Sequence, residues 1–172
     1  MTEQSPVQIR LLTSADAPLY REIRLEALRL SPEAFGSSYE QESPHPLIFF
    51  EEALTKADVF GAFREMDIVG IAGFRRQAGA KQAHKGLLWG MYVRPMARGT
   101  GVAQGLVAAV LRHAREHVEL LQLAVVSENE TAQRLYRSFG FVAYGHEVHS
   151  LKQRGRYYDE ILMAVPLAGI SK

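Results

Sequence analysis

The chain has 172 residues, and 47% of them are hydrophobic, which suffices for one domain with a sizeable core. Its 20 Lys and Arg residues are balanced by 19 Asp and Glu residues, and this net charge of +1 gives no general reason to expect nucleic acid or an anionic membrane as a partner. The absence of cysteine excludes disulfides, a thiolate nucleophile and a zinc site with cysteine ligands. The first residues lack the charged and apolar regions of a secretory signal, and no apolar run approaches the ~20 residues of a membrane helix, so we expect a cytoplasmic protein.

The first third of the chain predicts a strand followed by two helices. Residues 7–11 alternate apolar and polar side chains, as a half-buried strand does, and residues 19–30 carry apolar side chains at helical spacing. Residues 33–43 are less regular, and a second helix is predicted over residues 47–56. The broken segment between the two helices is either a mobile lid over a substrate or an ordinary connection.

The remainder of the chain predicts strands that alternate with helices. Strands are expected at residues 59–64, 68–74, 87–93, 120–126, 141–151 and 157–165, and helices at residues 102–118 and 130–139. This order is typical of a single α/β domain with a mixed sheet. The strands at residues 87–93 and 120–126 are expected to be parallel if they share that sheet, because a helix connects them.

A glycine-containing turn, residues 98–103, joins the strand at 87–93 to the next helix. Gly99 and Gly101 allow a sharp bend and a close backbone approach, and the first amides of the helix have no internal partners. Such a turn can hold phosphate oxygens, with Arg98 adding a charge at the rim, or it is simply a tight connection. A P-loop is excluded because no G-x-x-x-x-G-K-S/T string occurs, and the glycine spacing does not match the dinucleotide-binding fingerprint.

Two motifs resemble those of the GNAT family of N-acetyltransferases. Arg98-x-x-Gly101-x-Ala103 is similar to its Q/R-x-x-G-x-G/A signature, and the segment from Asn129 to Phe141, with Tyr136 and Gly140, looks like its second CoA-side motif. The resemblance implies a single GNAT domain over residues 1–172, with a mixed sheet of about seven strands, splayed parallel central strands and about four flanking helices. It also implies acetyl-CoA as the acyl donor. The implied donor-binding residues are Met91, Tyr92, Val93, Arg98, Gly99, Thr100, Gly101, Val102, Ala103, Asn129 and Tyr136.

Tyr136 is the implied catalytic residue, placed to protonate the departing CoA thiolate. The alternative is a core tyrosine on a buried helix face. Asn129 either bonds the CoA or caps the helix, two compatible roles, and a Ser127/Glu130 capping box is another option. Gly90, in the central strand, fits a bulge or a close backbone approach, or else it faces a bulky neighbour.

The general base is not evident in the sequence. Many relatives carry a glutamate on the central strand, whereas residues 87–93 contain no carboxylate here. The attacking amine is either already neutral or loses its proton to a residue of the last two strands. The candidates are His146, Glu147, His149, Asp159 and Glu160.

Two other features carry weaker alternatives. Trp89 either lines the acceptor pocket or belongs to the core. His113 and His117 have a spacing that can bind a metal, but H-E-x-x-H would need glutamate at Ala114, and Arg112 and Arg115 indicate a solvated face, so no metal site is predicted.

The favoured function is transfer of an acetyl group from acetyl-CoA to a primary amine of a small molecule or peptide, by direct attack in a ternary complex. Two alternatives stay open: a non-catalytic module that binds CoA or acyl-CoA, and a phosphate-binding domain for another nucleotide. No nucleic acid or membrane partner is expected. A homodimer fits the resemblance, although no residue demonstrates it, and the sequence does not select the acceptor.

Overall fold

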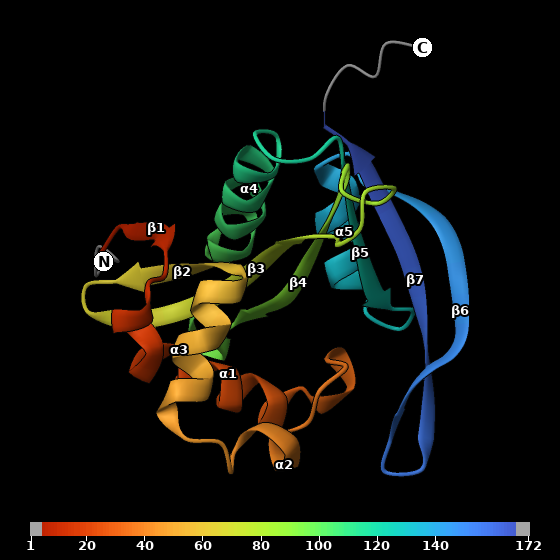
Figure 1. Cartoon of the computed structure of the whole chain (residues 1–172). Coiled ribbons are helices and arrows are strands. Elements are labelled where there is room, and N and C mark those ends of the chain that lie inside the picture. The colour runs from red at the N-terminus through yellow and green to blue at the C-terminus, as the bar shows by residue number, and fades with distance from the viewer. Residues whose placement is uncertain (1–4, 168–172) are drawn as a thin grey trace.

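A seven-stranded sheet organises the computed structural model, which describes residues 5–167 (Figure 1). The strands are β1 (Val7–Leu11), β2 (Asp58–Arg64), β3 (Asp67–Arg76), β4 (Lys85–Val93), β5 (Leu120–Val126), β6 (Val142–Gln153) and β7 (Arg156–Pro166). They lie side by side in the order β1-β2-β3-β4-β5-β7-β6. Every neighbouring pair is antiparallel except β4 and β5, which confirms the predicted mixed sheet with parallel central strands.

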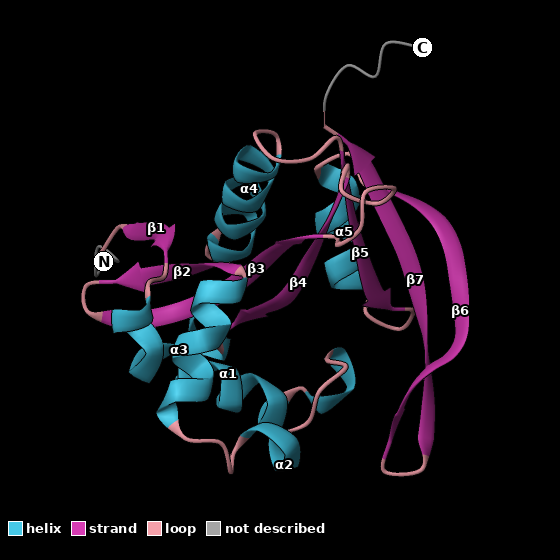
Figure 2. Cartoon of the chain, in the orientation of Figure 1, coloured by secondary structure: helices cyan, strands magenta, loops and turns pink. Residues whose placement is uncertain are grey.

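Five α-helices and three short 3₁₀ turns connect these strands within the described residues (Figure 2). The helices are α1 (Ala17–Leu30), α2 (Tyr39–Glu42), α3 (Leu47–Lys56), α4 (Val102–Ala114) and α5 (Glu130–Ser138). The 3₁₀ turns are η1 (Ser14–Asp16), η2 (Pro32–Ala34) and η3 (Pro95–Ala97). The predicted order of elements is confirmed, with α2 and the 3₁₀ turns added to it. None of the helices in residues 5–167 is long and apolar enough to cross a membrane.

Helices cover both faces of the sheet and create two hydrophobic cores. On one face, α4 buries Leu106 and Val110 together with Leu121 of β5. On the other face, Ile23 of α1 and Phe50 of α3 are buried against β2 and β3. Each such side chain contributes about 1.5–3 kcal/mol when it is fully removed from water. The apolar stripe that predicts α4 therefore faces the sheet, although the helix ends at Ala114 rather than at residue 118.

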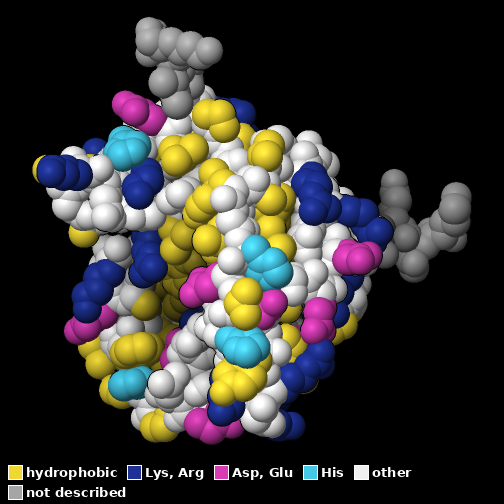
Figure 3. Space-filling view, turned by 90° about the vertical axis from the view of Figure 1, so that its right-hand side faces the viewer, with side chains coloured by type: hydrophobic (Ala, Val, Ile, Leu, Met, Phe, Trp, Pro, Cys, Tyr) yellow, Lys and Arg dark blue, Asp and Glu magenta, His cyan; other side chains and the backbone are white. Residues whose placement is uncertain are grey.

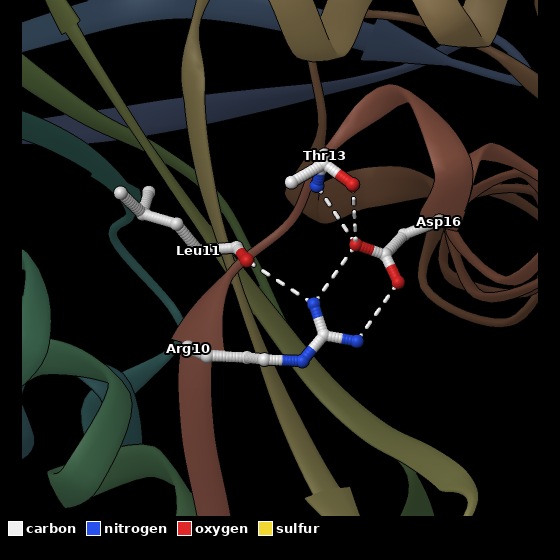
Figure 4. Close-up of polar contacts among 4 residues, drawn as sticks. All are labelled: Arg10, Leu11, Thr13 and Asp16. Atoms are coloured by element: carbon white, nitrogen blue, oxygen red, sulfur yellow. Dashed lines mark hydrogen bonds and ion pairs between the residues drawn. The ribbon is translucent and has the colours of Figure 1, made fainter.

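A compact polar junction links β1 to the start of α1 (Figure 4). Arg10 donates from Nη1 and Nη2 to Asp16 Oδ2 and Oδ1, each at 2.8 Å, and the Thr13 amide donates to Asp16 Oδ2 at 2.7 Å. The pKa of Asp16 is lowered from 3.8 to about 2, mainly by the hydrogen bond from the Arg10 guanidinium and further by the hydrogen bonds from Thr13. This carboxylate therefore fixes the angle between the edge strand and the first helix.

The two parallel strands separate soon after they begin. Residues 85–87 pair with residues 120–122, and no further β4–β5 pairs follow in the described part of the chain. A bulge interrupts the other edge of β4, because Ile71 and Gly73 of β3 pair with Tyr92 and Trp89, so that two residues of β4 stand opposite one of β3. Gly90 lies in this bulge with φ of 64°. The predicted splaying of the central strands is confirmed, and it opens a gap inside the sheet.

Candidate functional site

A cavity of about 400 Å³ occupies the gap between the diverging ends of β4 and β5. Its walls come from residues 88–93 of β4, residues 123–126 of β5, the first turns of α5, and residues 31–35 between α1 and α2. Figure 3 shows a recess with hydrophobic walls on the side of the molecule that carries β6 and β7. Arg98 and Ala103, beside the glycine turn, complete the lining, so the cavity is built by five segments drawn from three separate regions of the sequence.

The cavity reaches both faces of the sheet. On one side its wall includes Leu135 and Tyr136 of α5, which pack with the core beneath α4. On the other side its wall includes Phe35 and Trp89, which pack with the core beneath α1 and α3. Trp89 therefore both joins the core and lines the cavity. The cavity is therefore bounded by residues of both cores.

The predicted anion-binding turn has the required backbone geometry. Gly99 and Gly101 have φ of 72° and 85°, a left-handed conformation that favours glycine, and Gly101 is the N-cap of α4. A Cβ built on either glycine would meet no described atom within 4 Å, so the turn is open to a ligand. The first amides of α4 point out of the helix end. The turn therefore fits the phosphates of a bound nucleotide.

Two side chains of this turn have structural partners that the sequence does not reveal. The Thr100 hydroxyl donates to the carbonyl of Ala97 at 2.6 Å and accepts from Arg64 Nη2 at 2.7 Å. Arg98 Nε donates to the carbonyl of Val93 at 3.0 Å. These three contacts stabilise the turn, and Arg64 adds a positive charge beside it. Arg98 also lines the cavity.

The predicted donor-binding residues of β4, Met91, Tyr92 and Val93, all line the cavity. Their strand has left β5, so its edge offers backbone groups to a ligand. The ring of Tyr92 lies toward α1, because its hydroxyl donates to Glu26 Oε1 at 3.0 Å. Burial and the Glu26 carboxylate raise the pKa of Tyr92.

Asn129 and Tyr136 lie on the α5 wall. The Asn129 side chain accepts from the amide of Ala132 at 3.1 Å, so this residue is the N-cap and also lines the cavity. Tyr136 is 5% exposed and packs edge-on against Phe141, with ring centroids 5.8 Å apart. Burial strongly raises the pKa of Tyr136. Its hydroxyl therefore stays protonated at neutral pH.

Gln133 is a buried polar residue behind the cavity wall that sequence reasoning missed. Its side chain is 6% exposed, and Nε2 donates to the carbonyl of Ser127 at 2.8 Å. Arg137 Nη2 in turn donates to Gln133 Oε1 at 3.1 Å. These bonds fasten α5 to the end of β5 and orient Tyr136 one turn later. In the sequence, the feature that could have indicated this role is the polar Gln133 three positions before Tyr136, which places both on one side of the helix.

The five candidate bases do not line the cavity. They belong to the β6–β7 hairpin, where His146 Nε2 lies 2.9 Å from Asp159 Oδ2 and the His149 amide donates to Asp159 Oδ1 at 2.8 Å. Glu160 accepts from the Ser150 hydroxyl at 2.6 Å, and Glu147 stands opposite Glu160 in the register. These contacts give the cluster a structural role in the hairpin.

The link between α1 and α2 contributes residues that sequence reasoning left as irregular. Ser31, Glu33 and Phe35 line the cavity, and η2 packs against β5 and β6. Behind them, Arg24 donates from Nε and Nη2 to Glu42 at 3.0 and 2.7 Å. The link is therefore an ordered wall of the cavity.

The face of α4 that carries His113 is not solvated, contrary to the expectation from Arg112 and Arg115. The His113 side chain is 16% exposed, packs edge-on against Phe60 and Phe74, and places Nε2 2.7 Å from Asp58 Oδ2. Tertiary packing of α4 on β2 and β3 covers this histidine. Its role is to join α4 to the sheet.

Comparison with known proteins identifies the fold and the family. The model of the acetyltransferase (GNAT) family matches residues 23–141. A GNAT acetyltransferase from Streptococcus pneumoniae superimposes with a TM-score of 0.84 at 20% identity, covering 94% of this chain and 99% of that one. No curated protein matches the sequence significantly.

Two further solved structures share the fold. The putative acetyltransferase YncA of Salmonella typhimurium, solved with acetyl-CoA, gives a TM-score of 0.83 at 21% identity over 98% of both chains. A ribosomal-protein-alanine N-acetyltransferase from Brucella melitensis gives 0.76 at 26% identity, covering 93% of this chain and 99% of that one. The family model spans well over half of the sequence. This chain belongs to the GNAT family of acetyltransferases.

Proposed function

We propose that this protein transfers an acetyl group from acetyl-CoA to a primary amine within a ternary complex. The observation that carries the proposal is the cavity in the sheet, which extends from Arg98 and Ala103, on either side of the open turn at Gly99 and Gly101, to the protonated phenol of Tyr136. The Salmonella relative, solved with acetyl-CoA, supports the choice of donor. The Brucella relative, an alanine N-acetyltransferase, supports an amine as acceptor.

Different residues along the cavity would bind different parts of acetyl-CoA. Amides of Gly99, Thr100, Gly101, Val102 and Ala103 would hold the diphosphate, with Arg98 supplying a charge at the rim. The backbone of residues 91–93 would pair with the pantetheine arm, and Asn129 would bond the donor near the start of α5. A β4 amide in the gap would also stabilise the oxyanion that forms at the thioester.

Tyr136 would protonate the departing thiolate. Burial raises the pKa of this phenol, but the same apolar cavity raises the pKa of the departing thiol and so favours its protonated form. A short contact between the phenol and the sulfur would carry this proton transfer. The phenol is regenerated by a proton that the nitrogen loses.

The test is thiol release from acetyl-CoA in the presence of a panel of primary amines: 2-phenylethylamine, spermidine, phenylalanine and the dipeptide Ala-Arg. We expect release with at least one of them and none with a tertiary amine or without an acceptor. Calorimetry with acetyl-CoA and ATP accompanies the assay. Binding of acetyl-CoA without thiol release would favour the non-catalytic module, and preference for ATP would favour another nucleotide. The cytoplasmic location and the homodimer stay predictions.

A further inference from the structure

We propose that Glu33 is the general base of the reaction and receives the proton of the attacking ammonium. The inference deepens the proposed acetyl transfer and rests on it. Within residues 5–167, Glu33 is the one carboxylate on the cavity wall. The other ionisable groups of that wall are Tyr92, Arg98 and Tyr136. It lies in η2, immediately after α1, and not in the hairpin that holds the sequence-derived candidates.

The placement of η2 brings this carboxylate to the wall of the gap. Pro32 stops α1 and starts the 3₁₀ turn, which packs against β5 and β6 and so crosses from the α1 side to the separated strand. Glu33 is half-buried there. No hydrogen bond or ion pair engages its side chain in the part of the chain that the structure covers, in contrast to Asp159 and Glu160 of the hairpin, so the carboxylate is available to a substrate.

Acid and base then lie on opposite faces of the sheet. Tyr136 belongs to α5 and the core beneath α4, whereas the segment of Glu33 continues into Phe35, which packs with the core beneath α1. The donor has its phosphate turn at the N-terminus of α4, so its thiolate leaves toward the Tyr136 side. An amine that enters past η2 meets Glu33 first and the thioester next, which is the order that the chemistry requires.

The surrounding charges favour a cation at Glu33. Arg24 of α1 is neutralised by a bidentate contact with Glu42, whereas Arg29 in the last turn of α1 is exposed to solvent. Arg98, the cation on the cavity wall, donates to the carbonyl of Val93. β5 carries no ionisable residue, and β6 brings His146, Glu147, His149 and Lys152, of which His146 faces Asp159. Phe35 and Trp89 add aromatic walls, and the Arg24 guanidinium already lies over these two rings, 5.5 and 5.8 Å from their centroids. The acceptor is therefore inferred to bind as a cationic primary amine.

Glu33 and Tyr136 together account for every proton transferred in the reaction. The nitrogen of an alkylammonium loses one proton to the Glu33 carboxylate, which passes it to solvent. The freed lone pair attacks the thioester carbon, a C–N bond forms, and the C–S bond breaks with its electron pair leaving on sulfur. Tyr136 gives its proton to that sulfur and regains one when the nitrogen loses its second proton.

The experiment compares Glu33→Gln with the wild type, using the best amine of the panel. We expect kcat at pH 7 to fall about 100-fold, while the Kd of acetyl-CoA measured by calorimetry stays within twofold. An alkylammonium has a pKa of ~10, so the deficit should shrink as pH rises toward 10 and the amine becomes neutral without help. Glu33→Asp should recover part of the rate at pH 7.

Glu40→Gln is the matched control, because Glu40 lies on nearby α2, is exposed, and does not line the cavity. It should retain the wild-type rate. A Glu33→Gln rate equal to wild type, or a deficit that is constant from pH 7 to pH 10, would overturn the assignment of the base while leaving acetyl transfer intact. Absence of thiol release by the wild-type protein with every amine would instead overturn the proposed function, and the role of Glu33 with it.

Discussion

At the scale of single residues, Tyr136 combines a buried ring with a hydroxyl at the wall of the cavity. The ring packs against Phe141, and no hydrogen bond to the hydroxyl is formed within residues 5–167. Removing the hydroxyl therefore leaves the packing of α5 intact. The effect of Tyr136→Phe should consequently fall on the chemistry and not on the fold.

Tyr136→Phe is expected to lower kcat by about 10²–10⁴-fold, the range for loss of a positioned acid, because the thiolate must leave without a proton. The Kd of acetyl-CoA should change less than twofold. Steady-state kinetics and calorimetry measure the two quantities. Tyr157→Phe, at an exposed tyrosine of the hairpin outside the cavity, serves as the control. Unchanged turnover in Tyr136→Phe would remove this residue from the mechanism.

At the scale of elements, the β1–α1 junction shows how one carboxylate fastens two segments. Asp16 accepts from Arg10 and Thr13, and its pKa lies at about 2 instead of 3.8. A carboxyl group whose pKa is lower in the folded than in the unfolded state stabilises the fold at pH values above its unfolded-state pKa. The contribution is therefore complete above about pH 5 and is lost as pH falls from about 4 toward 2. The side chain of Arg10 is 42% exposed, so solvent screening reduces the effect.

Asp16→Asn is expected to lower the free energy of unfolding by about 1 kcal/mol at pH 7, after allowance for that screening. The difference from wild type should disappear as pH falls toward 2, since the wild-type carboxylate is then protonated too. Urea unfolding between pH 7 and pH 3 measures this trend. Asp67→Asn, at an exposed aspartate at the start of β3, should change stability little. A difference that does not depend on pH would contradict the assigned role of Asp16.

At the scale of the whole molecule, the separation of β4 from β5 leaves the sheet in two halves. They are joined by the pairs at residues 85–87 and 120–122 and by the packing of α4 near α5. A donor in the cavity would touch both halves at once, because residues 88–93 and 123–126 form opposite walls. Binding should therefore stabilise the fold as a unit.

Acetyl-CoA at 100 times its Kd is expected to raise the free energy of unfolding by about 2.7 kcal/mol, which is measured as an increase in Tm.

Gly101→Ala should raise the Kd of acetyl-CoA and reduce that increase in Tm. The reason is that φ of 85° strains an alanine and that its Cβ enters the open turn. Gly155→Ala is the matched control: φ is 80°, its Cβ also meets nothing within 4 Å, and it lies in the β6–β7 turn. If Gly101→Ala and Gly155→Ala reduced the acetyl-CoA-induced increase in Tm equally, the placement of the phosphate site at Gly101 would be contradicted.

The sequence by itself determined the order of elements, the glycine turn and the helix that carries Tyr136. These features depend on local signals: apolar spacing over one element, positive φ at Gly101, and the Asn129 cap of α5. The short α2 and η2 gave too weak a pattern to be predicted, because a helix of one turn buries little apolar surface of its own.

Only the tertiary structure decided which residues share the cavity. The sequence offered five candidate bases in the last two strands, yet the carboxylate on the cavity wall is Glu33, some 100 residues earlier. His113 likewise became a buried neighbour of Phe74 only when α4 packed on the sheet. Local periodicity fixes which face of an element is buried, but it does not specify which distant segment covers that face. The point where β4 leaves β5, and the link that closes over it, follow from long-range packing alone.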